Sequence, residues 1–234
     1  KTTLMRMVNR MVTPTSGTVT VRGRDVAQED PVALRRSIGY VLQDGGLFPH
    51  RTIVDNIATV PVLEGVSKAS ARADALKLME LVGLDPSMAK RYPAQLSGGQ
   101  RQRVGVARAL ANRADILLMD EPFGALDPLV RADLQRQLRR IQKSLGTTIL
   151  FVTHDIDEAI LLGDRIVLLR EGAQIAQEGT PRDLLLNPAN DFVREFLGTS
   201  AISERERILE GAPDGTQAGK PVTASANDAQ GERA

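Results

Sequence analysis

Cysteine and tryptophan are absent from this 234-residue chain, and aromatic residues make up only 3% of it. Without cysteine, the chain has neither disulfides nor thiolate ligands for a metal. So few aromatic side chains disfavour a platform on which nucleic-acid bases would stack. The net charge of +1 also argues against a large electrostatic footprint, so no nucleic-acid partner is expected.

Long hydrophobic runs are missing as well, since none approaches the ~18 apolar residues that a membrane-spanning helix needs. A role at a membrane would therefore depend on a partner. No secretory signal pattern is visible, which favours a cytosolic location. The chain opens with Lys1 rather than methionine, and we therefore expect it to be truncated at its N-terminus.

Strand and helix patterns alternate along most of the chain, which predicts an α/β fold. Short apolar or alternating runs predict strands at 18–21, 38–42, 116–119, 148–153 and 166–169, with 173–176 paired to the last. Helical spacing predicts helices at 3–12, 31–36, 52–64, 67–82, 128–145, 155–162, 181–186 and 190–197. The uninterrupted apolar run at 116–119 is typical of a buried parallel strand.

The predicted elements indicate one folded domain over residues 1–198. Between about Thr52 and Asn112 only helix is expected, which indicates a helical subdomain (about 52–112) inserted into the α/β domain. Residues 199–234 are poor in large aliphatic side chains and contain no aromatic residue. They predict a disordered C-terminal tail with at most one helical turn, at 203–210.

A Ser-Gly-Gly-Gln stretch after Leu96 is predicted to open a helix; it comprises Ser97, Gly98, Gly99 and Gln100. The free N–H groups and the positive dipole end of a helix N-terminus together favour an anion. Ser97 can cap this helix and also offer its hydroxyl to a phosphate. Taken alone, the stretch is explained at least as well by an ordinary turn.

Three predicted strands end at polar residues: Gln43, the pair Asp120 and Glu121, and His154 after Thr153. In an open parallel sheet, ligands bind beyond the carboxyl ends of the strands, so these residues are expected to face one site. Two carboxylates after a buried strand suit a magnesium–nucleotide site. Taken separately, each of these residues can also be explained without a ligand. The acidic pair could cap a helix, Gln43 could lie in an ordinary turn, and His154 could be a half-buried residue at a strand end.

In chain order, these stretches resemble the ATP-binding cassette (ABC) ATPases, over about residues 1–198. Lys1, Thr2 and Thr3 are similar to the end of the phosphate-binding Walker A loop, G-x-x-x-x-G-K-[ST]. The other matching stretches are the Q-loop glutamine Gln43, the signature at 96–100, the Walker B strand with its glutamate at 116–121, the D-loop at 124–127 and the switch histidine His154.

The resemblance implies a P-loop NTPase (RecA-like) core of parallel strands with the helical ABC subdomain inserted and the N-terminal strands missing. It implies that Glu121, His154 and Gln43 are catalytic and that Thr2, Gln43 and Asp120 hold Mg²⁺. It further implies the following ATP contacts: Lys1, Thr2, Thr3, Gln43, Asp120 and His154. Two copies would dimerise head to tail, so that Ser97, Gly98, Gly99 and Gln100 bind the partner's ATP and Asp127 bridges the two sites.

A closer resemblance, carried by residues 38–50, 91–93, 152–159 and 187–193, is to the ATPase subunits of osmoprotectant importers. It implies ATP-driven uptake of quaternary amines such as glycine betaine, choline, carnitine or proline betaine. The implied partners are transmembrane permease subunits, docked on the helical subdomain beside loop 44–50, and indirectly an extracytoplasmic substrate-binding protein. The implied location is the cytoplasmic face of the cell membrane, peripherally bound.

Two alternatives remain open at this point. The chain could serve an importer of another small solute, such as an amino acid, taurine or a polyamine. It could also be an ABC ATPase that takes no part in transport, although no coiled-coil insertion or second cassette is visible. The CBS regulatory domains of some osmoprotectant importers have no counterpart in this sequence, which leaves the form of regulation open.

Overall fold

The computed structural model describes residues 1–43, 45–124, 126–198 and 224–225. Contacts divide these residues into two units. The larger unit holds Thr2–Val152 and the two-residue strand β8 (Ala224–Ser225), and the smaller unit holds Lys1 with residues 153–198. Each unit contains its own hydrophobic cluster.

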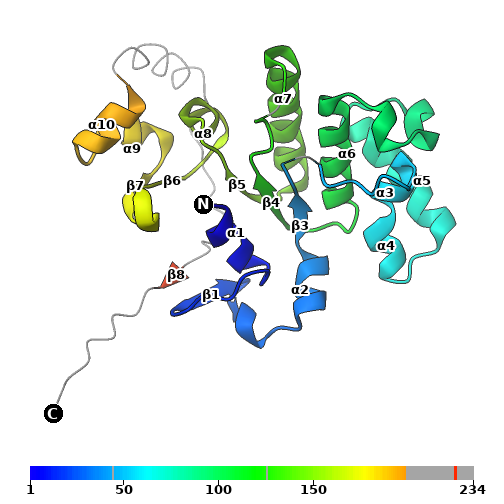
Figure 1. Ribbon diagram of the computed structural model, residues 1–234, viewed down its shortest axis with the longest axis horizontal. Helices are drawn as coiled ribbons and strands as arrows, with labels where there is room; N and C mark the ends of the chain where they lie inside the picture. Colours follow the sequence, from blue (N-terminus) through cyan, green and yellow to red (C-terminus); the bar gives the residue numbers. More distant parts are fainter. Residues whose placement is uncertain (44, 125, 199–223, 226–234) are drawn as a thin grey trace. The chain divides into compact units, whose positions relative to one another are not determined.

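The larger unit is built around a parallel sheet with the strand order β3-β4-β5 (Figure 1). Its strands are β3 (Gly39–Val41), β4 (Ile116–Asp120) and β5 (Thr148–Val152). All five residues of β4 are buried, as its apolar run predicts. The register pairs Val41 with Met119 and Asp120 with Val152, so the carboxyl ends of the three strands lie at the same edge.

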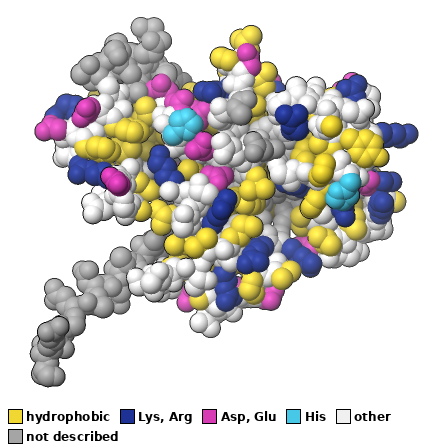
Figure 2. All heavy atoms as spheres, viewed as in Figure 1, with side chains coloured by type: hydrophobic (Ala, Val, Ile, Leu, Met, Phe, Trp, Pro, Cys, Tyr) yellow, Lys and Arg dark blue, Asp and Glu magenta, His cyan; other side chains and the backbone are white. Residues whose placement is uncertain are grey.

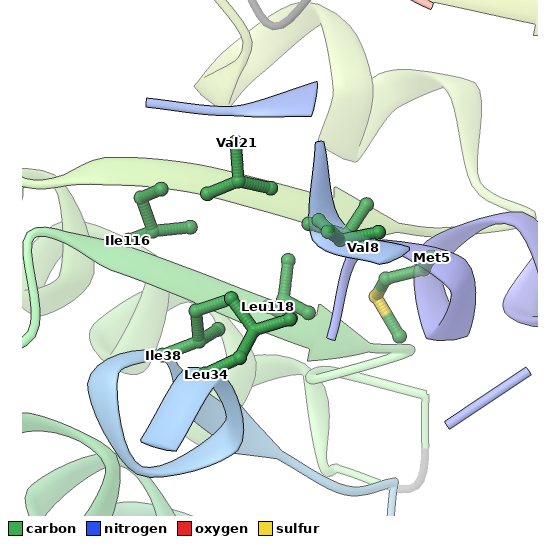
Figure 3. Close-up of a cluster of buried hydrophobic side chains, with 8 residues drawn as sticks. Met5, Val8, Val21, Leu34, Ile38, Ile116 and Leu118 are labelled. Carbon is green, nitrogen blue, oxygen red and sulfur yellow. The ribbon is translucent and has the colours of Figure 1, made fainter. Parts of the chain in front are cut away.

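Helices and a strand from the first forty residues pack onto β4. They are α1 (Thr2–Val8), β1 (Thr18–Val21) and α2 (Pro31–Ser37), and Figure 3 shows their side chains converging on Ile116 and Leu118. Met5 and Val8 anchor α1 in this cluster. Burying each such side chain contributes about 1.5–3 kcal/mol, which fixes the start of α1 against the sheet.

Two details differ from the expectations for this segment. The helix expected over 3–12 ends at Val8, because Arg10 adopts a left-handed φ of 55° that an α-helix does not continue through. An unexpected strand, β2 (Arg24–Asp25), pairs antiparallel with β1. The turn between them has positive φ at Arg22 and Gly23, as a tight hairpin requires.

Only helices lie between β3 and β4 among the residues that the structure describes there. They are α3 (Ile53–Ile57), α4 (Thr59–Leu63), α5 (Lys68–Leu81), the 3₁₀ turns η2 (Pro86–Lys90) and η3 (Pro93–Gln95), and α6 (Gly98–Leu110). The single helix expected over 52–64 is divided at Ala58, because Pro61 cannot donate to the carbonyl of Ile57. The subdomain boundaries themselves stay a prediction.

The long helix α7 (Pro128–Leu145) follows β4 and has the predicted ends. Asp127 caps its first turn by accepting from the Leu129 N–H, and Gly146 ends it with a φ of 63°. The expected inner face is buried at Leu134, Leu138 and Ile141. Leu145, predicted on that face, is 53% exposed because it lies on the last helical turn.

The smaller unit contains α8 (Ile156–Leu162), β6 (Ile166–Leu169), β7 (Ile175–Gly179), α9 (Pro181–Leu186) and α10 (Asp191–Leu197). The predicted pairing of β6 with the next strand is confirmed, and the two strands are antiparallel. That strand begins at Ile175, because the preceding turn η4 (Glu171–Ala173) has positive φ at Gly172 and Ala173. Ile160, Leu168, Leu184 and Val193 form part of the unit's core.

The C-terminal region tests few of the expectations. The disorder predicted for 199–234 and the helical turn at 203–210 lie outside the described residues, apart from the strand β8, which pairs with β1.

Within the described ranges, no helix has the length and apolar character needed to cross a bilayer. On the face seen in Figure 2, Lys and Arg side chains gather over α1 and α2.

Candidate functional site

Gln43 and the acidic pair meet at the carboxyl edge of the sheet, as their places after β3 and β4 predict. Gln43 Nε2 donates to Glu121 Oε2 across 3.4 Å. Gln43 is exposed and Glu121 is partly exposed, so both face solvent at this edge. The topology alone brings together two residues that are 78 positions apart in sequence.

Asp120 is held by the first residue of α1. Thr2 Oγ1 donates to Asp120 Oδ1 at 2.8 Å, and Asp120 is only 7% exposed. The core contacts of Met5 hold α1 against the sheet and thereby place Thr2 beside the end of β4. Thr3 is on the same helix with its side chain exposed.

Glu121 has a backbone conformation that the sequence does not reveal. Its N–H donates to the Val152 carbonyl at 2.9 Å and so continues the sheet ladder, but its φ is +45°. A non-glycine residue at positive φ costs about 1–3 kcal/mol, and such residues concentrate at functional sites. The chain turns away from the sheet at this residue, which leaves the carboxylate at the edge beside Gln43.

Ser97 begins α6 with the predicted cap. Its Oγ accepts from the Gln100 N–H at 3.2 Å, while Gln100 Oε1 accepts from the Ser97 N–H at 2.9 Å, a reciprocal capping box. Ser97 and Gly98 are exposed, and Gly99 is buried. A Cβ on Gly99 would lie 2.4 Å from Val130 Cγ1 of α7, so close packing requires glycine there.

The predicted D-loop precedes α7. Gly124 is exposed, and its N–H donates to the Glu121 carbonyl at 3.2 Å, which ties the start of the loop to the sheet edge. Asp127 is exposed and caps α7. Ala125 lies outside the described residues.

The smaller unit holds the remaining predicted site residues. Lys1 Nζ donates to the Thr153 carbonyl at 2.9 Å. Thr153 Oγ1 donates to the buried carboxylate of Glu158 at 2.6 Å and accepts from the Asp155 N–H, which fixes the turn that carries His154. His154 is exposed on this turn. Sequence reasoning missed Glu158, although an acid five residues after a strand end was visible.

The oxygen atoms at the sheet edge suit Mg²⁺ chemically. Mg²⁺ in nucleotide sites is bound through one or two carboxylates together with substrate phosphates, and a P-loop Ser or Thr hydroxyl is a recurrent ligand. Asp120 and Thr2 supply these two kinds of oxygen side by side. Within the described part of the chain, no group of three or more His, Cys, Asp or Glu residues could hold a metal without such a substrate.

The loop after the sheet edge is organised by Asn56 of α3, which is fully buried. Its Oδ1 accepts from the Phe48 N–H at 2.7 Å, and its Nδ2 donates to three carbonyls between Phe48 and Thr52. Phe48 stays 41% exposed with the Arg51 guanidinium 5.2 Å from its ring centre. Arg51 also lines a hollow of about 300 Å³, together with residues that include Asp55, Thr59 and Tyr92.

The model of the family described as "ABC transporter" matches residues 1–124, more than half of the chain. The chain belongs to the ABC transporter family. Among solved structures, the chain is similar to the ATP-binding cassette MJ0796, which was solved as a dimer bound to ADP and phosphate. The two chains are 33% identical and superpose with a TM-score of 0.70, and the match covers 77% of this chain and 80% of that one. The α/β P-loop NTPase fold predicted from the sequence is therefore confirmed.

Curated members of the ABC transporter family lie nearer in sequence. The carnitine transport ATP-binding protein OpuCA of Listeria monocytogenes is 51% identical over 93% of this chain and 53% of its own length. The glycine betaine uptake system ATP-binding protein YehX of Escherichia coli is 48% identical over 92% of this chain and 69% of its length. The chain thus spans about half the length of several curated relatives, and the expected resemblance to osmoprotectant importer ATPases is confirmed.

Proposed function

We propose that this chain is the ATP-binding and ATP-hydrolysing subunit of an ABC importer that energises uptake of quaternary-amine osmoprotectants such as glycine betaine. The observation that carries the enzymatic part is the sheet edge, where Thr2 meets Asp120 and Gln43 meets Glu121. Relatives named for carnitine and glycine betaine transport support the substrate class.

In this proposal, residues at the start of the chain bind the phosphates, and residues of the sheet edge bind the metal. Lys1 contacts the β- and γ-phosphates, and Thr3 supports the neighbouring phosphate side. Thr2, Asp120 and Gln43 would hold Mg²⁺, which would neutralise charge on the phosphate oxygens. Asp120 suits this role because it is anchored by Thr2 in a largely buried position.

Glu121 is the general base in the proposed reaction. Its carboxylate accepts a proton from water as the water oxygen bonds to the γ-phosphorus and the bond to the leaving ADP oxygen breaks. Gln43, within 3.4 Å of that carboxylate, orients the same water. His154 contacts the γ-phosphate and stabilises the state in which two copies of the chain are closed around ATP.

The second half of each ATP site comes from another copy of the chain in this proposal. Ser97, Gly98, Gly99 and Gln100 bind the γ-phosphate of the partner's ATP, and Asp127 links the two sites. The exposed hydroxyl of Ser97 at the start of a 13-residue helix supports this, because the N–H groups and dipole there favour an anion. A homodimer follows as the active form.

Permease subunits dock beside Phe48 in the proposed complex, over the hollow next to α3. An exposed aromatic residue whose backbone is held by the Asn56 hydrogen bonds resembles the anchors that dominate protein interfaces. Docking places the chain at the cytoplasmic face of the membrane as a peripheral subunit, and a substrate-binding protein participates only indirectly.

Reconstitution tests the proposal and separates it from the alternatives. The full-length protein, reconstituted with the permease and substrate-binding protein that the proposal assigns to it, should hydrolyse ATP and drive ATP-dependent uptake of labelled glycine betaine into vesicles. Hydrolysis with uptake of an amino acid, taurine or polyamine instead would correct the substrate. Hydrolysis without any coupled uptake would favour an ABC ATPase outside transport, and absence of hydrolysis would refute the enzymatic part.

A further inference from the structure

Arg108, near the C-terminal end of α6, makes a contact that the roles above do not use. Its guanidinium is partly buried and donates two hydrogen bonds of 2.8 Å, one from each terminal nitrogen, to the carbonyls of Gly46 and Gly45. Burial lowers the pKa of Arg108, and no carboxylate among the described residues forms an ion pair with it. The planar fork of the guanidinium suits two adjacent acceptors.

The loop that receives these hydrogen bonds packs directly on the backbone of α6. A Cβ on Gly105 would lie 3.3 Å from the Cα and the carbonyl oxygen of Gly45. A Cβ on Gly45, whose φ is +73°, would lie 3.0 Å from the carbonyl oxygen of Arg101. Two glycines thus permit the close approach that lets Arg108 reach both loop carbonyls.

This loop directly follows Gln43. The Gly45 N–H donates to the Leu42 carbonyl at 2.9 Å, which ties Gly45 to the residue that precedes Gln43. The Gln43 amide is already 3.4 Å from Glu121, near the limit of a hydrogen bond. A further displacement of the loop by about 1 Å would therefore remove that contact.

We propose that Arg108 is a positioning residue for Gln43. By fastening Gly45 and Gly46 to α6, it makes the loop move together with the helix that begins at Ser97. This inference rests on the proposed function, because it assigns Arg108 a role through Gln43 in ATP hydrolysis.

Steady-state kinetics of the full-length protein test this coupling. Arg108→Met keeps an unbranched apolar stem and removes the donors, Arg108→Lys keeps the charge without the fork, and Arg140→Met on the exposed side of α7 is the matched control. Arg108→Met should lower kcat for ATP hydrolysis by about 10- to 100-fold, since a misplacement of ~1 Å has effects of this size. KM for ATP should change much less than kcat, because Lys1, Thr2 and Asp120 keep their proposed contacts. The kcat of Arg108→Lys should lie between those of Arg108→Met and the unmodified protein, and Arg140→Met should match the unmodified protein.

A double-mutant cycle separates positioning from a general structural role. In a Gln43→Ala background, Arg108→Met should cause little further loss of kcat, because both changes remove the same contribution. If the double variant loses kcat by the product of the two single-variant factors, the proposal is overturned. A kcat of Arg108→Met equal to that of the unmodified protein would also overturn it.

Amide hydrogen exchange tests the contact without relying on hydrolysis. A peptide that covers residues 43–48 should exchange faster in Arg108→Met than in the unmodified protein and in Arg140→Met. Equal exchange in all three would overturn the role of Arg108 even if the protein hydrolysed no ATP. Lack of hydrolysis in the unmodified protein would instead count against the proposed function alone.

Discussion

The sheet edge and the start of α6 are both proposed to contact phosphate, but they are held in opposite ways. At the sheet edge, Thr2 donates to the buried Asp120, and residues far apart in sequence meet only because the chain has folded. At the start of α6, Ser97 and Gln100 satisfy each other within one turn. The first region depends on the whole sheet, whereas the helix cap of the second is complete within one turn and leaves Ser97 and Gly98 exposed.

The largest expected effect comes from changing the sheet edge at one carboxylate. Glu121→Gln preserves size and keeps an oxygen beside Gln43 but removes the proton acceptor. We expect phosphate release to slow by about 10²- to 10⁴-fold while ATP binding persists, so that ATP is trapped. Phosphate release and retention of labelled ATP measure the two quantities. Glu195→Gln in α10 is the control, and nearly normal hydrolysis in Glu121→Gln would eliminate Glu121 as the base.

A smaller but more selective effect is expected at the start of α6. Ser97→Asp keeps a good helix cap, so the free energy of unfolding should hardly change. Its negative charge would repel a phosphate, and we expect ATP hydrolysis to fall by about tenfold or more, a loss of ~1.4 kcal/mol in transition-state stabilisation. Ser97→Ala is the matched variant, since it lacks the cap and should lose about 1 kcal/mol of stability. Normal hydrolysis by Ser97→Asp would show that Ser97 meets no phosphate.

Much of the difference between the sheet edge and the start of α6 could be predicted from the sequence. The apolar run at 116–119 fixed the buried strand, and parallel topology then placed Gln43 and Asp120 at one edge. Local capping chemistry predicted the starts of α6 and α7 from Ser97 and Asp127. Each of these correct predictions depends on a strong local pattern or on a general rule of sheet topology.

The remaining features arise from tertiary contacts that leave no local pattern. The hydrogen bond from Arg108 to Gly46 joins residues 62 positions apart, and nothing distinguishes this arginine from its neighbours in α6. The positive φ of Glu121 and the packing of Gly99 against Val130 likewise depend on neighbours brought by folding. The roles of the site residues, Lys1 and His154 included, stay predictions.

The ion pair that joins α6 to α7 gives the smallest expected effect, which concerns stability rather than activity. Arg103, with a side chain 11% exposed, donates to Asp133 and Gln137 of α7 and to the carbonyl of Val82. Arg103→Met should lower the free energy of unfolding at neutral pH by about 1.5–3 kcal/mol, the usual value of hydrogen bonds to charged groups. Chemical denaturation measures this loss, with Arg140→Met as the control.

The same ion pair predicts how stability depends on acid. The hydrogen bond from Arg103, assisted by Arg136, lowers the pKa of Asp133 below its ordinary value. A carboxyl whose pKa is lower in the folded state stabilises the protein above the unfolded pKa, about 3.9, and loses that contribution as pH falls through the folded pKa. The difference in free energy of unfolding between the unmodified protein and Arg103→Met should therefore be constant from pH 7 to 5 and decrease below about pH 4.

Because Asp133 is 42% exposed, solvent screens this ion pair, and the decrease in that difference should be small. A difference that stays constant down to pH 3 would mean that Arg103 supports α6 through Val82 and Gln137 and not through the charge of Asp133.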